Sequence, residues 1–69
     1  MVEVFKTNVQ HRELAEQLAS ILRGKFDFSR INFDLDDCDK ILRVEGKQIC
    51  VELIVEMLST FGLECEVLT

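Results

Sequence analysis

The side chains that could bind a metal ion are one histidine, His11, and three cysteines, Cys38, Cys50 and Cys65. Imidazole and thiolate groups suit copper and zinc, provided that several of them converge on one ion. The cysteines lie 12 and 15 residues apart, which fits neither a Cys-x-x-Cys metal pair nor a disulfide framework. We therefore expect free thiols, no cofactor and no bound metal, with His11 as the first candidate ligand if a metal is bound.

Acidic side chains between Asp34 and Asp39 offer a second kind of metal chemistry. Taking Asp34 as the first position of a calcium-binding loop puts Glu45 at the twelfth, where such loops carry glutamate. The sixth position requires glycine and holds Asp39, so the sequence favours a solvated turn. No Ser/His/Asp set, catalytic carboxylate pair or glycine-rich phosphate loop can be recognised, so we expect a protein that is not an enzyme.

Hydropathy patterns predict the elements that would position these residues. Alternation predicts strands over residues 2–7, 31–36, 40–45 and 63–68. Helical spacing predicts one helix through the stretch from Leu14 to Phe26 and a second from Ile49 to Phe61, ended by Gly62. This order predicts one domain, residues 1–69, with an α+β, ferredoxin-like fold: a four-stranded antiparallel sheet with two helices on one face.

The sheet face that points away from the helices is the predicted interaction surface. Alternation places Phe5, Ile41, Arg43 and Leu68 there, with Phe5 and Ile41 on the two central strands. The predicted rim is acidic and consists of Glu3, Asp34, Glu45, Glu64 and Glu66. A small apolar centre with a polar rim suits a protein contact, so we expect a protein partner or a weak homodimer through this face. RNA is not expected, because sheets that bind RNA carry aromatic and basic residues.

The same patterns predict which of the three thiols are buried and which is exposed. Cys50 falls on the apolar stripe of the second helix, and Cys65 shares a strand face with Val67, so we expect both to be buried. Cys38 lies in the predicted turn between two strands, where acidic neighbours favour a solvated turn, and we expect it to be exposed.

The charge and the lack of long apolar runs exclude some partners. The net charge of −5 argues against a nucleic-acid backbone or an anionic membrane surface as partner. No apolar run approaches the roughly 18 residues that span a bilayer. The N-terminal residues are typical of a strand and not of a signal peptide, so we expect a cytoplasmic protein.

Three short segments resemble the heavy-metal-associated domain family, which includes small copper chaperones. Ile31-Asn32-Phe33-Asp34-Leu35 resembles its second strand, Leu42-Arg43-Val44-Glu45-Gly46 its third strand and following turn, and Phe61-Gly62-Leu63 the end of its second helix. The family's Gly-Met-x-Cys-x-x-Cys motif is replaced here, because His11 and Leu14 stand at the two cysteine positions. The resemblance implies a ferredoxin-like fold with a degenerate metal site.

The expected function is therefore a small non-catalytic binding or adaptor domain that contacts another protein. The alternative is a metal-binding or trafficking protein with non-standard ligands, His11 and a thiol. Leu14 counts against this alternative, because one imidazole and one leucine cannot replace two thiolates around a soft metal.

Overall fold

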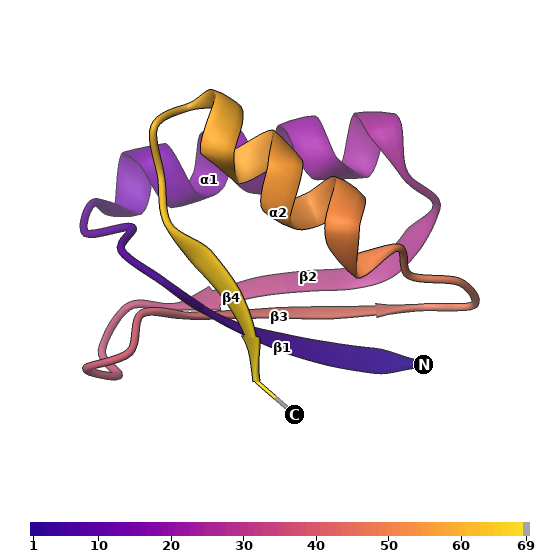
Figure 1. Cartoon of the computed structure of the whole chain (residues 1–69), viewed down its shortest axis with the longest axis horizontal. Helices are drawn as coiled ribbons and strands as arrows, with labels where there is room; N and C mark the ends of the chain where they lie inside the picture. Colours follow the sequence, from indigo (N-terminus) through magenta and orange to yellow (C-terminus); the bar gives the residue numbers. More distant parts are fainter. Residues whose placement is uncertain (69) are drawn as a thin grey trace.

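The computed structural model describes residues 1–68 and shows two layers, a sheet and a pair of helices that cover one of its faces (Figure 1). The elements are β1 (Val2–Thr7), α1 (Arg12–Lys25), β2 (Phe28–Asp34), β3 (Ile41–Gly46), α2 (Val51–Thr60) and β4 (Cys65–Leu68). The strands lie in the order β2-β3-β1-β4, and each neighbouring pair is antiparallel. The predicted ferredoxin-like α+β fold is confirmed.

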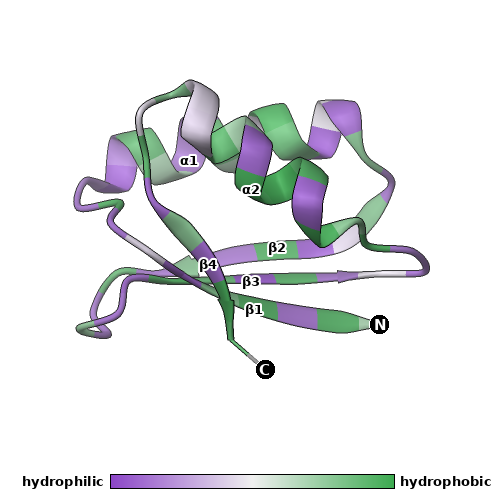
Figure 2. Cartoon of the chain, in the orientation of Figure 1, coloured by the Kyte–Doolittle hydropathy of each residue, from purple (hydrophilic) through white to green (hydrophobic). Residues whose placement is uncertain are grey.

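Apolar stripes on both helices pack against the sheet and form the core (Figure 2). The buried apolar side chains are Ala15, Leu18, Ala19 and Leu22 of α1, Ile54, Met57 and Leu58 of α2, Phe5, Ile31, Phe33, Leu42 and Val44 of the sheet, and Val9 of the loop after β1. A chain of this size buries only about 60% of the surface that it exposes when unfolded. The larger of these side chains therefore contribute most of the apolar burial that stabilises the fold.

The second helix ends at a glycine, as predicted, but begins later than predicted. Gly62 has a φ of +76°, a conformation that glycine adopts without the steric cost of a Cβ atom. Its amide donates to the Ser59 carbonyl at 2.9 Å, and the Leu63 amide donates to the Leu58 carbonyl at 3.0 Å. The helix begins at Val51, so the preceding Cys50 is its N-cap and not part of its apolar stripe.

Thr7, the last residue of β1, is hydrogen-bonded to two loops: the loop that follows β1 and the turn between β2 and β3. Its side chain is buried, and its hydroxyl donates to the Lys40 carbonyl at 2.6 Å. The same oxygen accepts a hydrogen bond from the Val9 amide at 3.2 Å. Thr7 therefore fixes the β1–α1 connection against the β2–β3 hairpin, and it does not cap α1, whose N-cap is His11.

Candidate interaction surface

Phe5 belongs to the core, and its predicted place on the exposed face is wrong. Its side chain is fully buried (0% exposed), and it lies opposite Leu42 of β3 and Val67 of β4. Residues directly opposite in antiparallel strands share one face of the sheet, so all three point toward the helices. Both alternating sets of β1 contain apolar side chains, and burying the phenyl ring removes more apolar surface from water than burying a valine.

The other alternating set of β1 lines the open face. Val4 lies opposite Arg43 of β3 and Leu68 of β4. Ile41, Arg43 and Leu68 therefore lie on the open face, as predicted. We call Val2, Val4, Ile41 and Leu68 the open-face strip; Val2 is 45% exposed, Leu68 is 41% exposed and the other two are half-buried. The spacing of Val2 and Val4 in the sequence shows that they share a face, but not that this face is the open one.

Charged side chains of both signs surround the open-face strip. The basic ones are Lys6, Arg30 and Arg43, and the acidic ones are Asp34, Glu45 and Glu66. Arg30 lies opposite Glu45, and Lys6 lies opposite Glu66, so opposite charges occupy neighbouring positions. The predicted excess of carboxylates is not found at the paired positions of this face. The orientation of β1 moves Glu3 to the helix side and brings Lys6 to the open face, β2 adds Arg30, and Glu64 precedes β4 without a register partner.

The three thiols have different surroundings, and one prediction about them is wrong. Cys38 is exposed, as expected for a turn residue. Cys50 is exposed as well, because it precedes α2 and does not pack under it. Cys65 is half-buried between β4 and α2, and this burial raises the pKa of its thiol from 9.0 to about 11.

Alkylation under native conditions is expected to modify Cys38 and Cys50 rapidly and Cys65 slowly. At pH 8 the raised pKa leaves Cys65 with a thiolate fraction roughly 100-fold smaller than that of an ordinary thiol. Mass spectrometry of peptides after timed iodoacetamide treatment measures the three rates. Cys65 reacting as fast as Cys50 would contradict the assignment.

The raised pKa of Cys65 also predicts that the free energy of unfolding falls as the pH rises through about 9 to 11. In that range the unfolded chain releases the thiol proton of Cys65 and the folded chain keeps it.

His11 does not join a set of converging metal ligands in the part of the chain that the structure describes. It is exposed at the start of α1, and its side chain makes no capping hydrogen bond. The one group of three donors found among residues 1–68 is Asp37, Cys38 and Asp39, whose donor atoms lie within 4.8 Å of one another. The Asp37 carboxylate accepts the Asp39 amide at 2.9 Å, so local turn geometry accounts for this grouping.

Comparison with known proteins adds no further assignment: no family model matches the chain, and neither a curated protein nor a solved structure does. Within residues 1–68, neither helix has the length and apolar character needed to cross a bilayer. The open face of the sheet therefore has to be interpreted from its own geometry and charges.

Proposed function

We propose that the protein is a small non-catalytic binding domain that associates weakly with a second copy of itself through the open face of its sheet. The observation that supports this proposal is the open-face strip, an apolar centre that charges of both signs surround. The resemblance to heavy-metal-associated domains fits a scaffold used without its metal, since His11 and Leu14 replace the thiol pair. We place the domain in the cytoplasm, where its three free thiols stay reduced.

The balance of charge on the open face favours a second copy over a strongly acidic or basic partner. At the paired strand positions of this face, three cations balance three carboxylates, so these positions do not favour a partner of one sign. A two-fold symmetric contact presents the same mixture from both sides, so opposite charges can pair across the axis.

The size of the open face limits how tight this contact can be. A stable interface buries about 800 Å² per partner, and the described residues expose 4675 Å² in total. Such an interface would need about a sixth of the surface, whereas the strip contains four apolar side chains, of which two are already half-buried. We therefore expect a dissociation constant on the order of 0.1 mM.

Replacing Val2 and Leu68 together with serine is expected to weaken self-association by roughly 10-fold to 100-fold. These are the two most exposed side chains of the strip, and a two-fold dimer loses both from each copy. About 0.5 kcal/mol of apolar burial for each of the four side chains gives this change. Sedimentation velocity at rising protein concentrations measures the dimer fraction of the wild type and of the variant.

Leu53→Ser together with Phe61→Ser is the matched control, because these apolar side chains are 48% and 50% exposed on the helix layer. They line a groove of about 280 Å³ between α1 and α2, on the other side of the molecule from the open face. A dimer that is lost in this control and kept in the Val2/Leu68 variant would move the interface to the helix layer and reject the proposal. A wild type that is monomeric at every concentration would reject it as well.

A further inference from the structure

The outer edge of β4 is an unpaired strand edge. β4 is the last strand in the order β2-β3-β1-β4, and no strand within residues 1–68 pairs with its outer side (Figure 1). The opposite edge is protected: the Arg12 guanidinium donates to the Phe33 carbonyl of β2 at 3.2 Å, and the β2–β3 register is irregular between Phe28 and Arg30. Such features discourage strand addition, so β4 is the edge at which another strand can pair.

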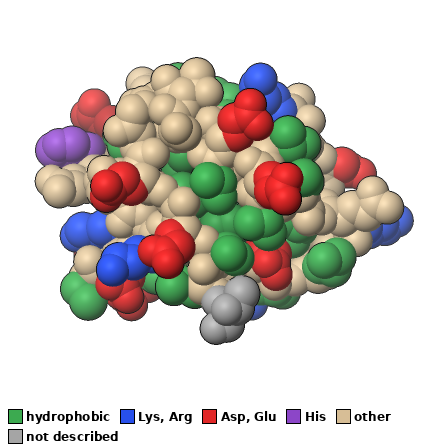
Figure 3. Space-filling model, in the orientation of Figure 1, with side chains coloured by type: hydrophobic (Ala, Val, Ile, Leu, Met, Phe, Trp, Pro, Cys, Tyr) green, Lys and Arg blue, Asp and Glu red, His purple; other side chains and the backbone are tan. Residues whose placement is uncertain are grey.

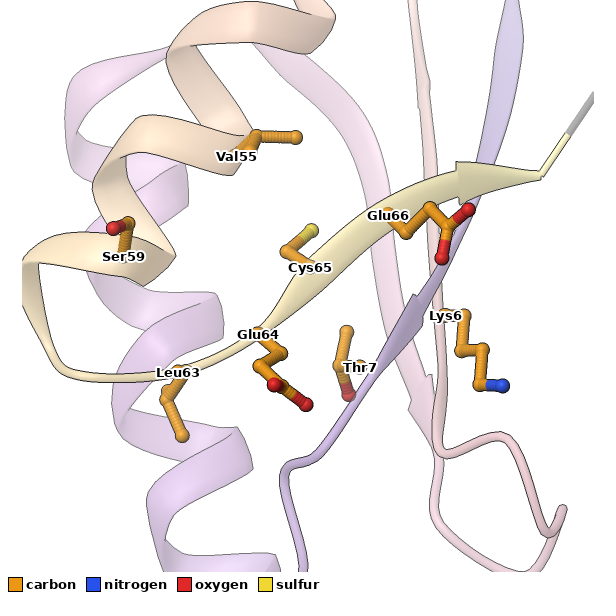
Figure 4. A pocket seen from close by; sticks show the side chains of 8 residues that line it. All are labelled: Lys6, Thr7, Val55, Ser59, Leu63, Glu64, Cys65 and Glu66. Carbon is orange, nitrogen blue, oxygen red and sulfur yellow. The ribbon is translucent and has the colours of Figure 1, made fainter.

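A groove of about 540 Å³ runs beside this edge, between β4 and α2 (Figure 4). Val55 and Ser59 of α2, Leu63 of the following loop and Cys65 of β4 line its helix side. The rest of the lining is Lys6 and Thr7 of β1, with Glu64 and Glu66. In Figure 4, Cys65 points from β4 toward α2, whereas Glu66 lies on the other side of the strand. In the orientation of Figure 1, the space-filling surface shows hydrophobic and acidic side chains, with a basic side chain against an acidic one at the lower left (Figure 3). The groove therefore offers an apolar wall on one side of β4, and on the other side the Glu66 carboxylate with Lys6 opposite it.

The chain from residue 48 to residue 68, which includes α2 and β4, carries only negative charges, and the one cation that lines the groove, Lys6 of β1, pairs with Asp39. Residues 48–68 contain no lysine or arginine, and their four acidic residues are Glu52, Glu56, Glu64 and Glu66. The one ion pair found among residues 1–68 joins Lys6 and Asp39 at 3.7 Å, so none of these four carboxylates forms an ion pair there, although Lys6 lies opposite Glu66. This part of the surface therefore attracts a basic segment and repels an acidic one.

We propose that the β4 edge binds an extended, basic segment of a protein partner, which adds to the sheet as a fifth strand. Side chains of an added strand point alternately to the two faces of the sheet. One set would enter the groove beside Val55 and Cys65 and should be apolar, and the other set would lie near Glu66 and should be basic. The segment recognised is therefore one in which apolar and basic residues alternate.

A second copy of the chain does not fit this edge. Opposite residues of an antiparallel pair share a face, so two β4 strands would place Glu66 opposite either Glu66 or Leu68 of the other copy. The first arrangement sets like charges directly opposite each other, and both bring together two edges without a basic residue. The edge contact uses the unpaired backbone of β4 and not the apolar open-face strip, and Glu66 borders both sites.

Three fluorescein-labelled seven-residue peptides test the edge site by fluorescence anisotropy. The first alternates lysine and valine, the second has glutamate at each lysine position, and the third has proline in place of the central valine. Proline removes a backbone donor from the ladder, and glutamate reverses the charge, so each is expected to weaken binding at least about 10-fold. Glu66→Lys should weaken binding of the first peptide about fivefold.

Glu16→Lys on α1 is the matched control, because it changes the net charge equally at an exposed site outside the groove. The alternating peptide should also slow alkylation of Cys65 and leave the rates of Cys38 and Cys50 unchanged, since neither of these thiols lines the groove. Equal binding of the proline peptide would overturn strand addition, and equal binding of the glutamate peptide would overturn charge recognition. No binding of the lysine–valine peptide, or equal losses in the two lysine variants, would reject the site. None of these outcomes changes the sedimentation result expected for the Val2/Leu68 variant, so the edge site and the self-association are tested separately.

Discussion

Replacing Phe5 with alanine is expected to lower the free energy of unfolding by about 3–5 kcal/mol, the usual cost of removing a buried phenyl ring. The side chain is fully buried on a central strand, opposite Leu42 and Val67, and its loss leaves a cavity between the sheet and the helices. Small domains have little stability to spare, so the variant should be largely unfolded at 37 °C. Urea denaturation followed by circular dichroism measures the difference.

Phe61→Ala provides the matched control, because it is the same substitution at a side chain that is 50% exposed. Its cost should be below about 1 kcal/mol, since little packing is lost at the surface. Equal stabilities for the Phe5 and Phe61 variants would contradict the placement of Phe5 in the core and would restore it to the exposed face.

Thr7→Val is expected to cost about 1–3 kcal/mol, although the two side chains have nearly the same shape. The substitution removes the hydroxyl that donates to the Lys40 carbonyl at 2.6 Å and accepts the Val9 amide at 3.2 Å. Thr7 is buried and Val9 is fully buried, so the amide of Val9 would lose its partner away from water. Thermal and urea unfolding measure the change in stability.

Thr60→Val is the control for this substitution, because the Thr60 hydroxyl donates to the Glu56 carbonyl at an exposed position near the end of α2. Water can replace that bond, so its loss should change stability by less than about 0.5 kcal/mol. If Thr7→Val proves as mild as Thr60→Val, the Thr7 hydroxyl does not hold the loops together.

Local patterns were sufficient to predict the order of the elements. Strict alternation around Phe33 and the apolar spacing around Leu18 and Leu22 each allow one face to be buried, so the sequence determines both element type and orientation. Gly62 was predicted as the end of α2 for a similarly local reason, since a left-handed residue is needed there. The six elements in this order leave few possible topologies, and the ferredoxin-like fold follows from them.

Local patterns failed where a residue lay at an element boundary. Cys50 has the spacing of the α2 stripe, but α2 begins one residue later, and an N-cap residue need not follow the helical periodicity. Its exposure is therefore decided by where the chain leaves β3 and enters the helix. The groove beside β4 could not be predicted from the sequence either, because Val55 and Cys65 belong to different elements and come together only when these pack.

The orientation of β1 is the clearest case in which the tertiary structure decided what the sequence left open. Val2 and Val4 form one apolar set, and Phe5 belongs to the other, so alternation alone permits either face to be buried. The choice depends on the strands on both sides: the register places Phe5 between Leu42 and Val67, and the space between the layers accommodates a phenyl ring there. That long-range pairing brings Val2, Val4 and Lys6 to the open face, and a strand's own sequence cannot specify it.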